Sequence, residues 1–546
     1  MLSSHEPWPF LKSCVEEGIL LPVDLLLPRF LSKQQELSEE QAAFLALMMA
    51  QYREGHVCLS WEGEGTLWTM ARQGASGPWM QEIMEGAPLP LAPIYSDPPR
   101  YYFQKPWTFE TEVINHLQRL MQTTPVVPIP IVALEEGFNK QQQEAIERGI
   151  RSPVSLIVGG PGTGKTFTAK GLVQQCIRAL PLAEKEKFRI VLTAPTGKAV
   201  AHLQQQLLPV LEGTDPERIL TGTLHALLRV REGDEEETPP ILLTDLILVD
   251  ECSMIDARLW ARLLSAVPSG ARLVLIGDAD QLPAVGMGCF FADLMGVEAI
   301  LKTRLIEGKR TVDPRLAGLT QALIVNPKTE ALAYLREVCV DLTPGVFDKV
   351  LEKVAHWWPP LLIETEKSEE WLWRMEQFRL LSCLRQGPWG VDALNARLFS
   401  FFRSQLSHEG WWGIPILITK NDEASELYNG DTGVLVRRIK STLQSDRLSV
   451  EDYAVFPGKG VIPALALPPF EYAYCLSVHK SQGSEYKEVV LIVPEGSERF
   501  GKEILYTAVT RAKESLSIYG SLACIEQMLG KTSCKRSGLR QRLQGN

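Results

Sequence analysis

Short apolar runs that alternate with helical patterns predict an α/β protein built on two parallel sheets. Four runs rich in Val, Ile and Leu end in polar or glycine residues: Ser155–Val158, Arg189–Leu192, Leu246–Val249 and Arg272–Ile276. Such runs are typical of strands buried on both faces of a parallel sheet, whose ligand site lies at the carboxyl ends of the strands. A second set, Ala473–Ser477 and Glu488–Val493, predicts another such sheet near the C-terminus.

These patterns also divide the chain, because 546 residues exceed what one hydrophobic core serves. The proline-rich run 124–130 cannot continue a helix and predicts a hinge. The stretch 411–470 is richer in Gly, Pro and alternating β-type residues, which indicates a small β-rich insertion. The expected units are an N-terminal helical domain at 1–133, a first α/β domain at 134–300, a second at 301–410 plus 471–530, the insertion at 411–470, and a basic tail at 531–546.

Composition narrows the class of protein without deciding its ligand. The hydrophobic fraction of 45% and charged fraction of 22% fit a soluble globular protein, and we expect it in the cytoplasm because neither a secretory signal nor a membrane-crossing stretch is visible. Ten cysteines without C-x-x-C spacing indicate core thiols in a reducing compartment. The net charge of −10 argues against a basic coat, although a motor protein can line an internal channel with Lys and Arg. Residues 531–546 contain five basic residues and no acidic residue, and the simpler interpretation is that this segment is a solvated tail.

A phosphate-binding loop follows the first predicted strand. It fits G-x-x-x-x-G-K-[ST] and consists of Gly159, Gly160, Pro161, Gly162, Thr163, Gly164, Lys165 and Thr166. Glycines let successive backbone N–H groups surround phosphate oxygens, Lys165 supplies charge for the β- and γ-phosphates, and the Thr166 hydroxyl suits Mg²⁺. The loop lies between a strand and a helix, as its function requires, so we expect a site for ATP and Mg²⁺.

Two acidic residues end the strand at 246–249 and complete the requirements for hydrolysis. Asp250 is expected to hold Mg²⁺, and Glu251 to act as general base for attack on the γ-phosphate. An apolar strand that ends in two acids is a weak signal alone. About 85 residues after a phosphate loop it becomes a strong one.

Several further runs follow predicted strands or lie near the C-terminus: 193–199, 277–283, 477–485 and 506–513. In their order along the chain and in their residues they resemble the motif set of superfamily 1 helicases, and they closely resemble that of the RecD group. The runs 384–395, 418–422 and 428–433 are similar to RecD-specific segments, and 55–59, 100–103 and 536–539 extend the likeness to both ends of the chain. The resemblance implies two RecA-like P-loop domains with an SH3-like insertion.

The resemblance also implies roles for single residues around the nucleotide. Gln142 would read adenine, although Gln141 and Gln143 leave the register open. Gln281 would sense the γ-phosphate and link it to DNA. Further residues placed at the nucleotide are Glu485 and two arginine fingers from the second domain, Arg310 and Arg511, of which Arg310 stands in a run only loosely similar to the family.

Other residues fall in runs that line the DNA groove of such motors: Pro195, Thr196, Lys198, Thr223, His225, Asn395, Ser477 and His479. Groups that donate to phosphate oxygens, and surfaces on which bases stack, do not distinguish one base from another. We therefore expect little preference for particular DNA sequences. Structural roles remain the alternative for His225 and His479. The acidic segment 229–243, where such motors place a strand-separating hairpin, is either that pin or a solvated loop.

By resemblance the chain is a 5′–3′ helicase on single-stranded DNA and the alpha subunit of a RecBCD-type helicase–nuclease in double-strand break repair and recombination. Its partners would be RecB-like and RecC-like subunits, with the N-terminal domain docking on the latter. One alternative is a nuclease, but outside the ATP site we find no carboxylate-and-lysine cluster with two-metal spacing. Others are a structural subunit with an idle ATP site, which the intact ATP-site residues argue against, and a stand-alone RecD-like motor.

Overall fold

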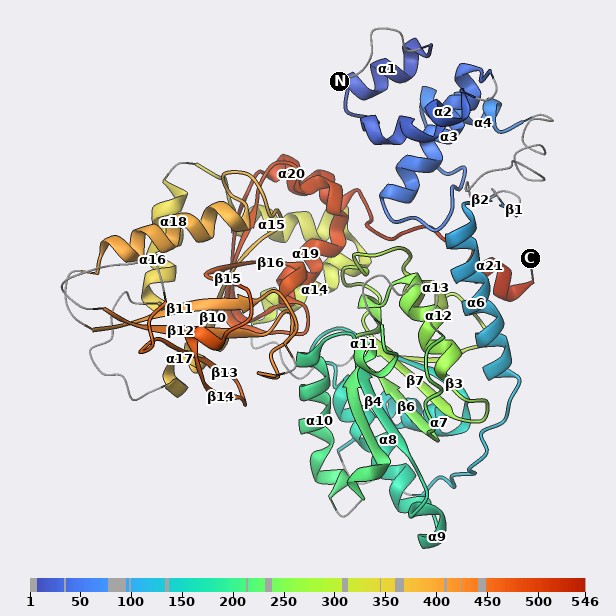
Figure 1. Cartoon of the computed structure of the whole chain (residues 1–546), viewed down its shortest axis with the longest axis vertical. Helices are drawn as coiled ribbons and strands as arrows, with labels where there is room; N and C mark the ends of the chain where they lie inside the picture. The colour runs from blue at the N-terminus through green and yellow to red at the C-terminus, as the bar shows by residue number, and fades with distance from the viewer. Residues whose placement is uncertain are drawn as a thin grey trace.

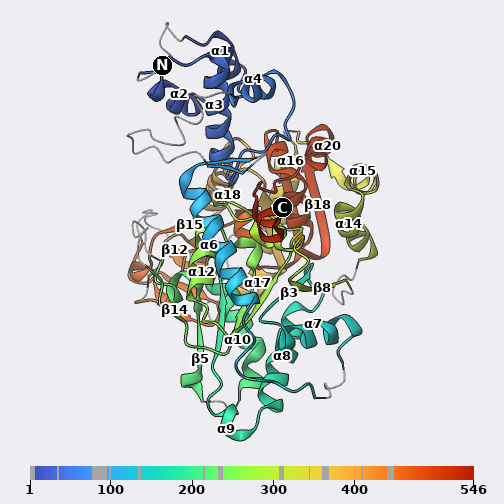
Figure 2. The same cartoon turned by 90° about the vertical axis from the view of Figure 1, so that its right-hand side faces the viewer.

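The computed structural model describes residues 7–33, 36–76, 95–97, 100–132, 137–212, 215–230, 238–306, 313–343, 345–358, 368–406, 410–422, 424–439 and 448–545. Two parallel sheets form its centre, an antiparallel sheet adjoins the second of them, and N-terminal helices lie at one end of the long axis (Figures 1 and 2). None of the helices in these ranges is long and apolar enough to span a membrane.

The first sheet has six parallel strands in the order β5-β4-β6-β7-β3-β8. Their bounds are β3 Val154–Gly159, β4 Ile190–Ala194, β5 Ile219–Thr223, β6 Leu246–Val249, β7 Arg272–Gly277 and β8 Leu301–Leu305. The four strands predicted from apolar runs are confirmed, with ends that differ by at most two residues. Strand β8 corrects the expected domain boundary at 300, because its backbone pairs with β3 and completes this sheet.

Helices cover both faces of the first sheet, as the apolar strands require. One face packs against α7 Lys140–Arg151, α8 Lys165–Ala179 and α10 Gly197–Leu211. The other packs against α6 Gln104–Met121, α11 Leu224–Leu227, α12 Ala257–Ala266 and α13 Phe290–Leu294. Helix α6 lay inside the expected N-terminal domain, but its buried residues Val113, Leu117 and Leu120 join the core of this sheet. The short helix α9 Leu182–Lys185 follows α8.

The second sheet is also parallel, in the order β16-β10-β17-β18-β9. Its strands are β9 Cys339–Val340, β10 Phe378–Ser382, β16 Cys475–Ser477, β17 Tyr486–Val493 and β18 Ala512–Gly520. One face packs on α16 Val346–Trp357, α17 Ser368–Gln377 and α18 Val391–Ser404. The other packs on α14 Pro314–Val325, α15 Leu332–Val338, α19 Gly501–Val509 and α20 Leu522–Leu529.

Between β10 and β16 the chain leaves this sheet to form a five-stranded antiparallel sheet in the order β14-β13-β12-β11-β15. Its strands are β11 Gly410–Ile418, β12 Thr432–Ile439, β13 Tyr453–Phe456, β14 Gly460–Pro463 and β15 Phe470–Tyr472. Alternating side chains of these strands share a core with α17 and α18. The β-type alternation at 411–470 therefore corresponds to one compact sheet.

The N-terminal helices have a hydrophobic core of their own. They are α1 Pro9–Glu16, α2 Leu26–Leu31, α3 Glu39–Arg53 and α4 Thr66–Gly74, and a two-stranded ribbon of β1 Tyr95–Asp97 and β2 Arg100–Tyr102 follows. Helix α3 begins at a reciprocal cap, in which the Ser38 hydroxyl accepts from the Gln41 N–H and the Gln41 side chain accepts from the Ser38 N–H. This helical unit ends near residue 103, where α6 begins.

The C-terminal segment is ordered, so the expectation of a solvated tail is wrong. Helix α21 Leu539–Gln544 packs beside α6, with Leu539 fully buried (Figure 1). The Arg542 guanidinium donates to the buried Glu110 carboxylate at 3.0 Å, and the Gly538 N–H donates to the same group at 2.9 Å. Basic residues of this segment, such as Arg542, pair with groups that are distant in sequence. The balance of charges within the segment could not predict these contacts.

Candidate active site

The phosphate loop connects the end of β3 to the start of α8. Gly162 and Gly164 have φ of 76° and 85°, a left-handed region that favours glycine. The Lys165 ammonium donates to the carbonyls of Gly159 at 2.7 Å and Gly160 at 3.0 Å, so it lies across the mouth of the loop. The loop therefore presents its cation and the N-terminus of α8 at the carboxyl edge of the sheet.

Of the three successive glutamines, Gln142 lies against the phosphate loop. Its Nε2 donates to the Thr163 carbonyl at 3.4 Å, while its Oε1 caps α7 by accepting from the Asn139 N–H. Gln141 instead accepts from the Ile306 N–H, and Gln143 donates to the Phe138 carbonyl. This placement favours Gln142 as the residue nearest to a bound base.

Three carboxylates gather beside Lys165 at the ends of β6 and β7. Burial raises the pKa of Asp250, Glu251 and Asp278, and the Lys165 charge acts in the opposite direction on all three. A divalent cation would relieve this concentration of buried negative charge. Thr166 and Asp250 are the residues that would hold Mg²⁺, which keeps several of its positions for water and phosphate oxygens.

The second sheet contributes its polar residues to the same place. Arg511 is buried, and its guanidinium donates to the carbonyls of Thr507 and Ser484 at 3.0 and 2.9 Å. Its charge also counteracts the raised pKa of Glu251, which places the two groups near one another. Glu485 lies 3.8 Å from the Lys513 ammonium. The predicted Arg310 falls outside the described residues.

Hydrogen bonds join the two sheets around the run 277–283. The Leu282 N–H donates to the Thr507 hydroxyl at 2.9 Å, and the Gln482 amide donates to the Leu282 carbonyl at 3.1 Å. The Gln281 amide and the Tyr506 hydroxyl both donate to Asp278 Oδ2, at 2.9 and 3.0 Å. Sequence reasoning did not single out Asp278, Thr507 or Tyr506, although all three stand in the runs that carried the resemblance.

Comparisons with known proteins agree with this geometry. Residues 142–287 match the model of an AAA domain, and 472–519 match that of a UvrD-like helicase C-terminal domain. The RecBCD enzyme subunit RecD of Mycobacterium tuberculosis (strain CDC 1551 / Oshkosh) is 31% identical, with 93% of this chain and 92% of that protein covered. This chain belongs to the RecD family. It is a helicase of superfamily 1, and its phosphate-loop fold implies ATP and a divalent metal as cofactors.

Other similar proteins span the same family and its neighbours. The RecD subunit of Mycolicibacterium smegmatis is 31% identical, covering 96% of this chain and 98% of that protein. The ATP-dependent RecD2 DNA helicase of Deinococcus radiodurans is 28% identical, covering 71% of this chain and 49% of its own length. Among solved structures, Bacteroides Pif1 bound to ssDNA is 15% identical, with a TM-score of 0.40 and coverage of 71% of this chain and 94% of that one.

Four of the residues that the RecD resemblance assigns to DNA lie at the carboxyl ends of β4, β5 and β16: Pro195, Thr196, Thr223 and Ser477. The hydroxyl groups of Thr196, Thr223 and Ser477 each accept a hydrogen bond from a backbone N–H. Desolvation lowers the pKa of His225 and of His479, although the His225 side chain is exposed to solvent and that of His479 is half-buried.

Two other assigned residues are already engaged. The Lys198 ammonium donates to the Ser484 hydroxyl at 2.7 Å across the two sheets. The Asn395 amide exchanges two hydrogen bonds with the Cys475 backbone, at 3.0 and 2.8 Å. These two bonds tie β16 to α18.

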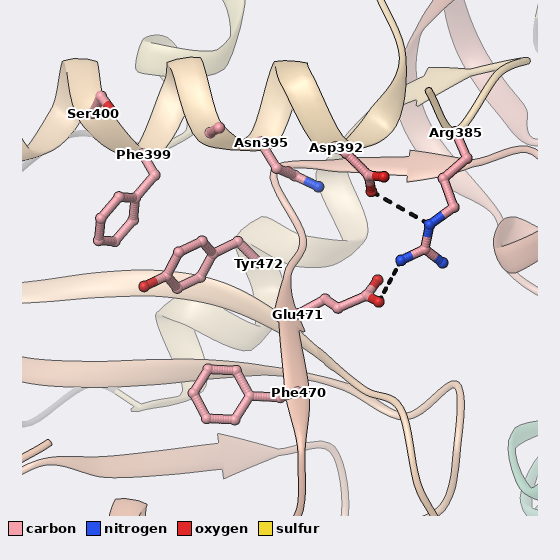
Figure 3. Close-up of a pocket in the computed structure, with 9 residues that line it drawn as sticks. Arg385, Asp392, Asn395, Phe399, Ser400, Phe470, Glu471 and Tyr472 are labelled. Atoms are coloured by element: carbon pink, nitrogen blue, oxygen red, sulfur yellow. Dashed lines mark hydrogen bonds and ion pairs between the residues drawn. The ribbon is translucent and has the colours of Figure 1, made fainter. Parts of the chain in front are cut away.

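Asn395 also lies at the back of an open groove of about 520 Å³ between α18 and β15 (Figure 3). The rings of Phe399 and Tyr472 stack there with centroids 4.2 Å apart. The Arg385 guanidinium bridges Glu471 at 2.5 Å and Asp392 at 3.4 Å. The groove thus holds aromatic side chains beside an arginine that is paired with two carboxylates, at the edge where β10 and β16 end.

Proposed function

We propose that this chain is an ATP-driven translocase on single-stranded DNA that unwinds duplex ends in the 5′–3′ direction. It would act as the RecD subunit of a RecBCD-type complex in double-strand break repair and recombination. The observation that carries the proposal is the meeting of the Asp250–Glu251 pair, the phosphate loop and Arg511 at one junction between two parallel sheets. Family membership supports the substrate and the complex.

Each residue at this junction has a chemical task. Lys165 and the loop N–H groups hold the phosphates, and Thr166 and Asp250 would hold Mg²⁺, which would supply positive charge beside the transferring phosphoryl group. Glu251 accepts a proton from the attacking water. Arg511 stabilises charge that develops on the γ-phosphate once the sheets close, an effect worth about 10³–10⁵ in rate for such fingers.

Closing and opening of the junction would move DNA contacts carried by the two sheets relative to one another. The residues at the ends of β4 and β5 belong to one sheet and Ser477 belongs to the other, next to the groove at Arg385 between α18 and β15. Backbone contacts and stacking on Phe399 or Tyr472 hold a strand without reading its sequence. A hinge cycle driven by hydrolysis then becomes translocation.

The N-terminal helices supply a surface that fits a RecC-like partner. Five large apolar side chains within twelve residues are exposed there: Ile19, Leu21, Val23, Leu26 and Phe30. These helices stand away from both parallel sheets, and such an exposed apolar patch is typical of a protein interface (Figure 1). Because RecD relatives are named as subunits of the RecBCD enzyme, we assign the patch to the complex.

Tailed duplexes test the proposed function directly. The full chain, with and without RecB-like and RecC-like partners, should unwind duplexes that carry only a 5′ tail and should hydrolyse ATP faster with single-stranded DNA. Unwinding confined to 3′ tails would refute the polarity. Hydrolysis that survives Lys165→Ala would refute the motor itself, and nucleotides released by the isolated chain in Mg²⁺ would support the nuclease alternative instead.

A further inference from the structure

Tyr506 is a buried link between the two halves of the nucleotide site. It lies on α19, which packs on the second sheet, and only 2% of its surface is exposed. Its hydroxyl donates to Asp278, the residue that directly follows β7 in the first sheet. Burial and the adjacent carboxylate raise the pKa of the Tyr506 hydroxyl, so it keeps its proton and remains a donor.

The same carboxylate oxygen connects Tyr506 to Gln281. Asp278 Oδ2 receives both the Tyr506 hydroxyl and the Gln281 Nε2, while Oδ1 receives the Asp280 N–H at 3.1 Å. The Gln281 Oε1 is buried and has no hydrogen-bond partner within the described structure. The Gln281 amide is therefore oriented by Asp278 alone, and Asp278 is in turn held from the other sheet by Tyr506.

Tyr506 also touches the phosphate loop. A Cβ atom added at Gly160 would stand 2.9 Å from the Tyr506 hydroxyl oxygen, so the glycine leaves room for that hydroxyl. Arg511 follows five residues later, and its guanidinium donates to the carbonyl of Thr507, the neighbour of Tyr506. Tyr506 and Arg511 therefore belong to one segment of the second domain that lies against the phosphate loop.

We propose that Tyr506 is a positioning residue that couples DNA binding to hydrolysis. Its hydroxyl holds Asp278, and through it the Gln281 amide, in register with the segment that carries Arg511. When DNA contacts change the relation of the two sheets, this link transmits the change to the groups around the γ-phosphate. The inference rests on the proposed function, since it assumes an ATPase that DNA stimulates.

Tyr506→Phe tests the link because it removes one oxygen atom and keeps the ring. Because the substitution removes the hydrogen bond from Tyr506 to the buried Asp278 carboxylate, we expect the DNA-stimulated kcat to fall about tenfold. The KM for ATP should change less than about twofold, because uniform ground-state binding is untouched. Tyr519→Phe is the matched control: Tyr519 is buried on β18 of the same sheet, and its hydroxyl makes no hydrogen bond among the described residues.

A double-mutant cycle separates coupling from packing. Asp278→Asn and Tyr506→Phe should show strongly non-additive effects on the ratio of DNA-stimulated to DNA-free hydrolysis, because both act through one contact. An unchanged ratio in Tyr506→Phe, with or without a lower melting temperature, would overturn the inference. If the wild-type chain shows no DNA stimulation at all, the proposed function fails first and the inference falls with it.

Discussion

The backbone at Glu251 is held in a conformation that non-glycine residues rarely adopt, with φ of 53°. Such strain persists only where surrounding contacts enforce it, and it collects at functional sites. Here the sharp turn directs the residue after Asp250 toward Lys165 and Arg511, whose charges both act on its carboxylate. Burial and the neighbouring Asp250 raise the pKa of Glu251 against the effect of these two cations, which suits a group that must take a proton from water.

Glu251→Gln should therefore separate binding from chemistry. The amide keeps the size of the carboxylate but cannot accept the proton, so kcat should fall about 10²–10⁴-fold. The affinity for ATP should stay nearly unchanged, since the phosphate contacts come from the loop. Single-turnover hydrolysis and titration with a fluorescent ATP analogue measure the two effects. The control is Glu514→Gln, an exposed carboxylate that pairs with Lys487 on the second sheet; equal losses in both variants would contradict the assignment.

At the residue level, the sequence predicted the groups whose chemistry is fixed by local spacing. The phosphate loop needs only a strand, a helix and eight residues, and Asp250–Glu251 needs only the end of a strand. One hydrogen-bond partner of Asp278, Tyr506, stands 228 positions away along the chain. Contacts of that kind follow from the tertiary fold, so no local pattern could identify them.

Among the elements, edge strands and terminal helices were the least predictable. Strand β8 is amphipathic rather than continuously apolar, because only one neighbour covers it, and its sequence therefore lacks the signal of a central strand. Helix α6 was assigned to the N-terminal unit by chain order, but burial of its apolar stripe joins it to the first sheet. The position of a helix along the chain therefore does not predict its domain when the helix packs on strands that come later in the sequence.

The pairing of α21 with α6 makes a prediction for Arg542. Its guanidinium donates to fully buried Glu110 at 3.0 Å and lies 3.7 Å from the centre of the Trp107 ring. Arg542→Ala would leave the buried carboxylate without its cation, which costs about 3–5 kcal/mol in comparable pairs. Urea unfolding followed by tryptophan fluorescence should show a loss of that order. Arg540→Ala, on the exposed side of the same helix, should change stability by less than about 0.5 kcal/mol.

Asp293 in α13 gives the same junction a pH dependence. Burial raises the pKa of Asp293 to about 7, although its carboxylate accepts from the Ser537 hydroxyl at 2.6 Å. Because the folded state then binds the proton more tightly than the unfolded state, this contribution to stability is complete below about pH 4 and is lost as pH rises through about 7. The unfolding free energy of the wild type should fall in that window relative to Asp293→Asn, by about 4 kcal/mol, because a change of one in pKa is worth about 1.4 kcal/mol. Parallel curves for the two proteins would contradict the assignment.

For the whole molecule, the arrangement separates three tasks. We assign ATP hydrolysis to the sheet junction and the DNA track to the carboxyl edges of both sheets. The N-terminal helices stand apart from both sheets (Figures 1 and 2). A surface that is remote from the nucleotide can bind a partner without obstructing the hinge. Assembly and motor activity should therefore be separable by mutation.

Replacing Ile19, Leu26 and Phe30 with Ser tests that separation. All three are exposed, so the substitutions remove apolar surface without opening the core formed by α1–α4. Loss of a hot-spot cluster should weaken binding to a RecC-like subunit by about 100-fold or more. The DNA-stimulated ATPase of the isolated chain should stay within about twofold of the wild type, since the patch lies on helices that have a hydrophobic core of their own. Co-purification and biosensor titration measure the first effect, and a coupled ATPase assay the second.

The matched control replaces Val450, Val461 and Leu465, which are exposed on the insertion, with Ser. If this control weakens the complex equally, or if the N-terminal variant binds normally, the docking surface lies elsewhere.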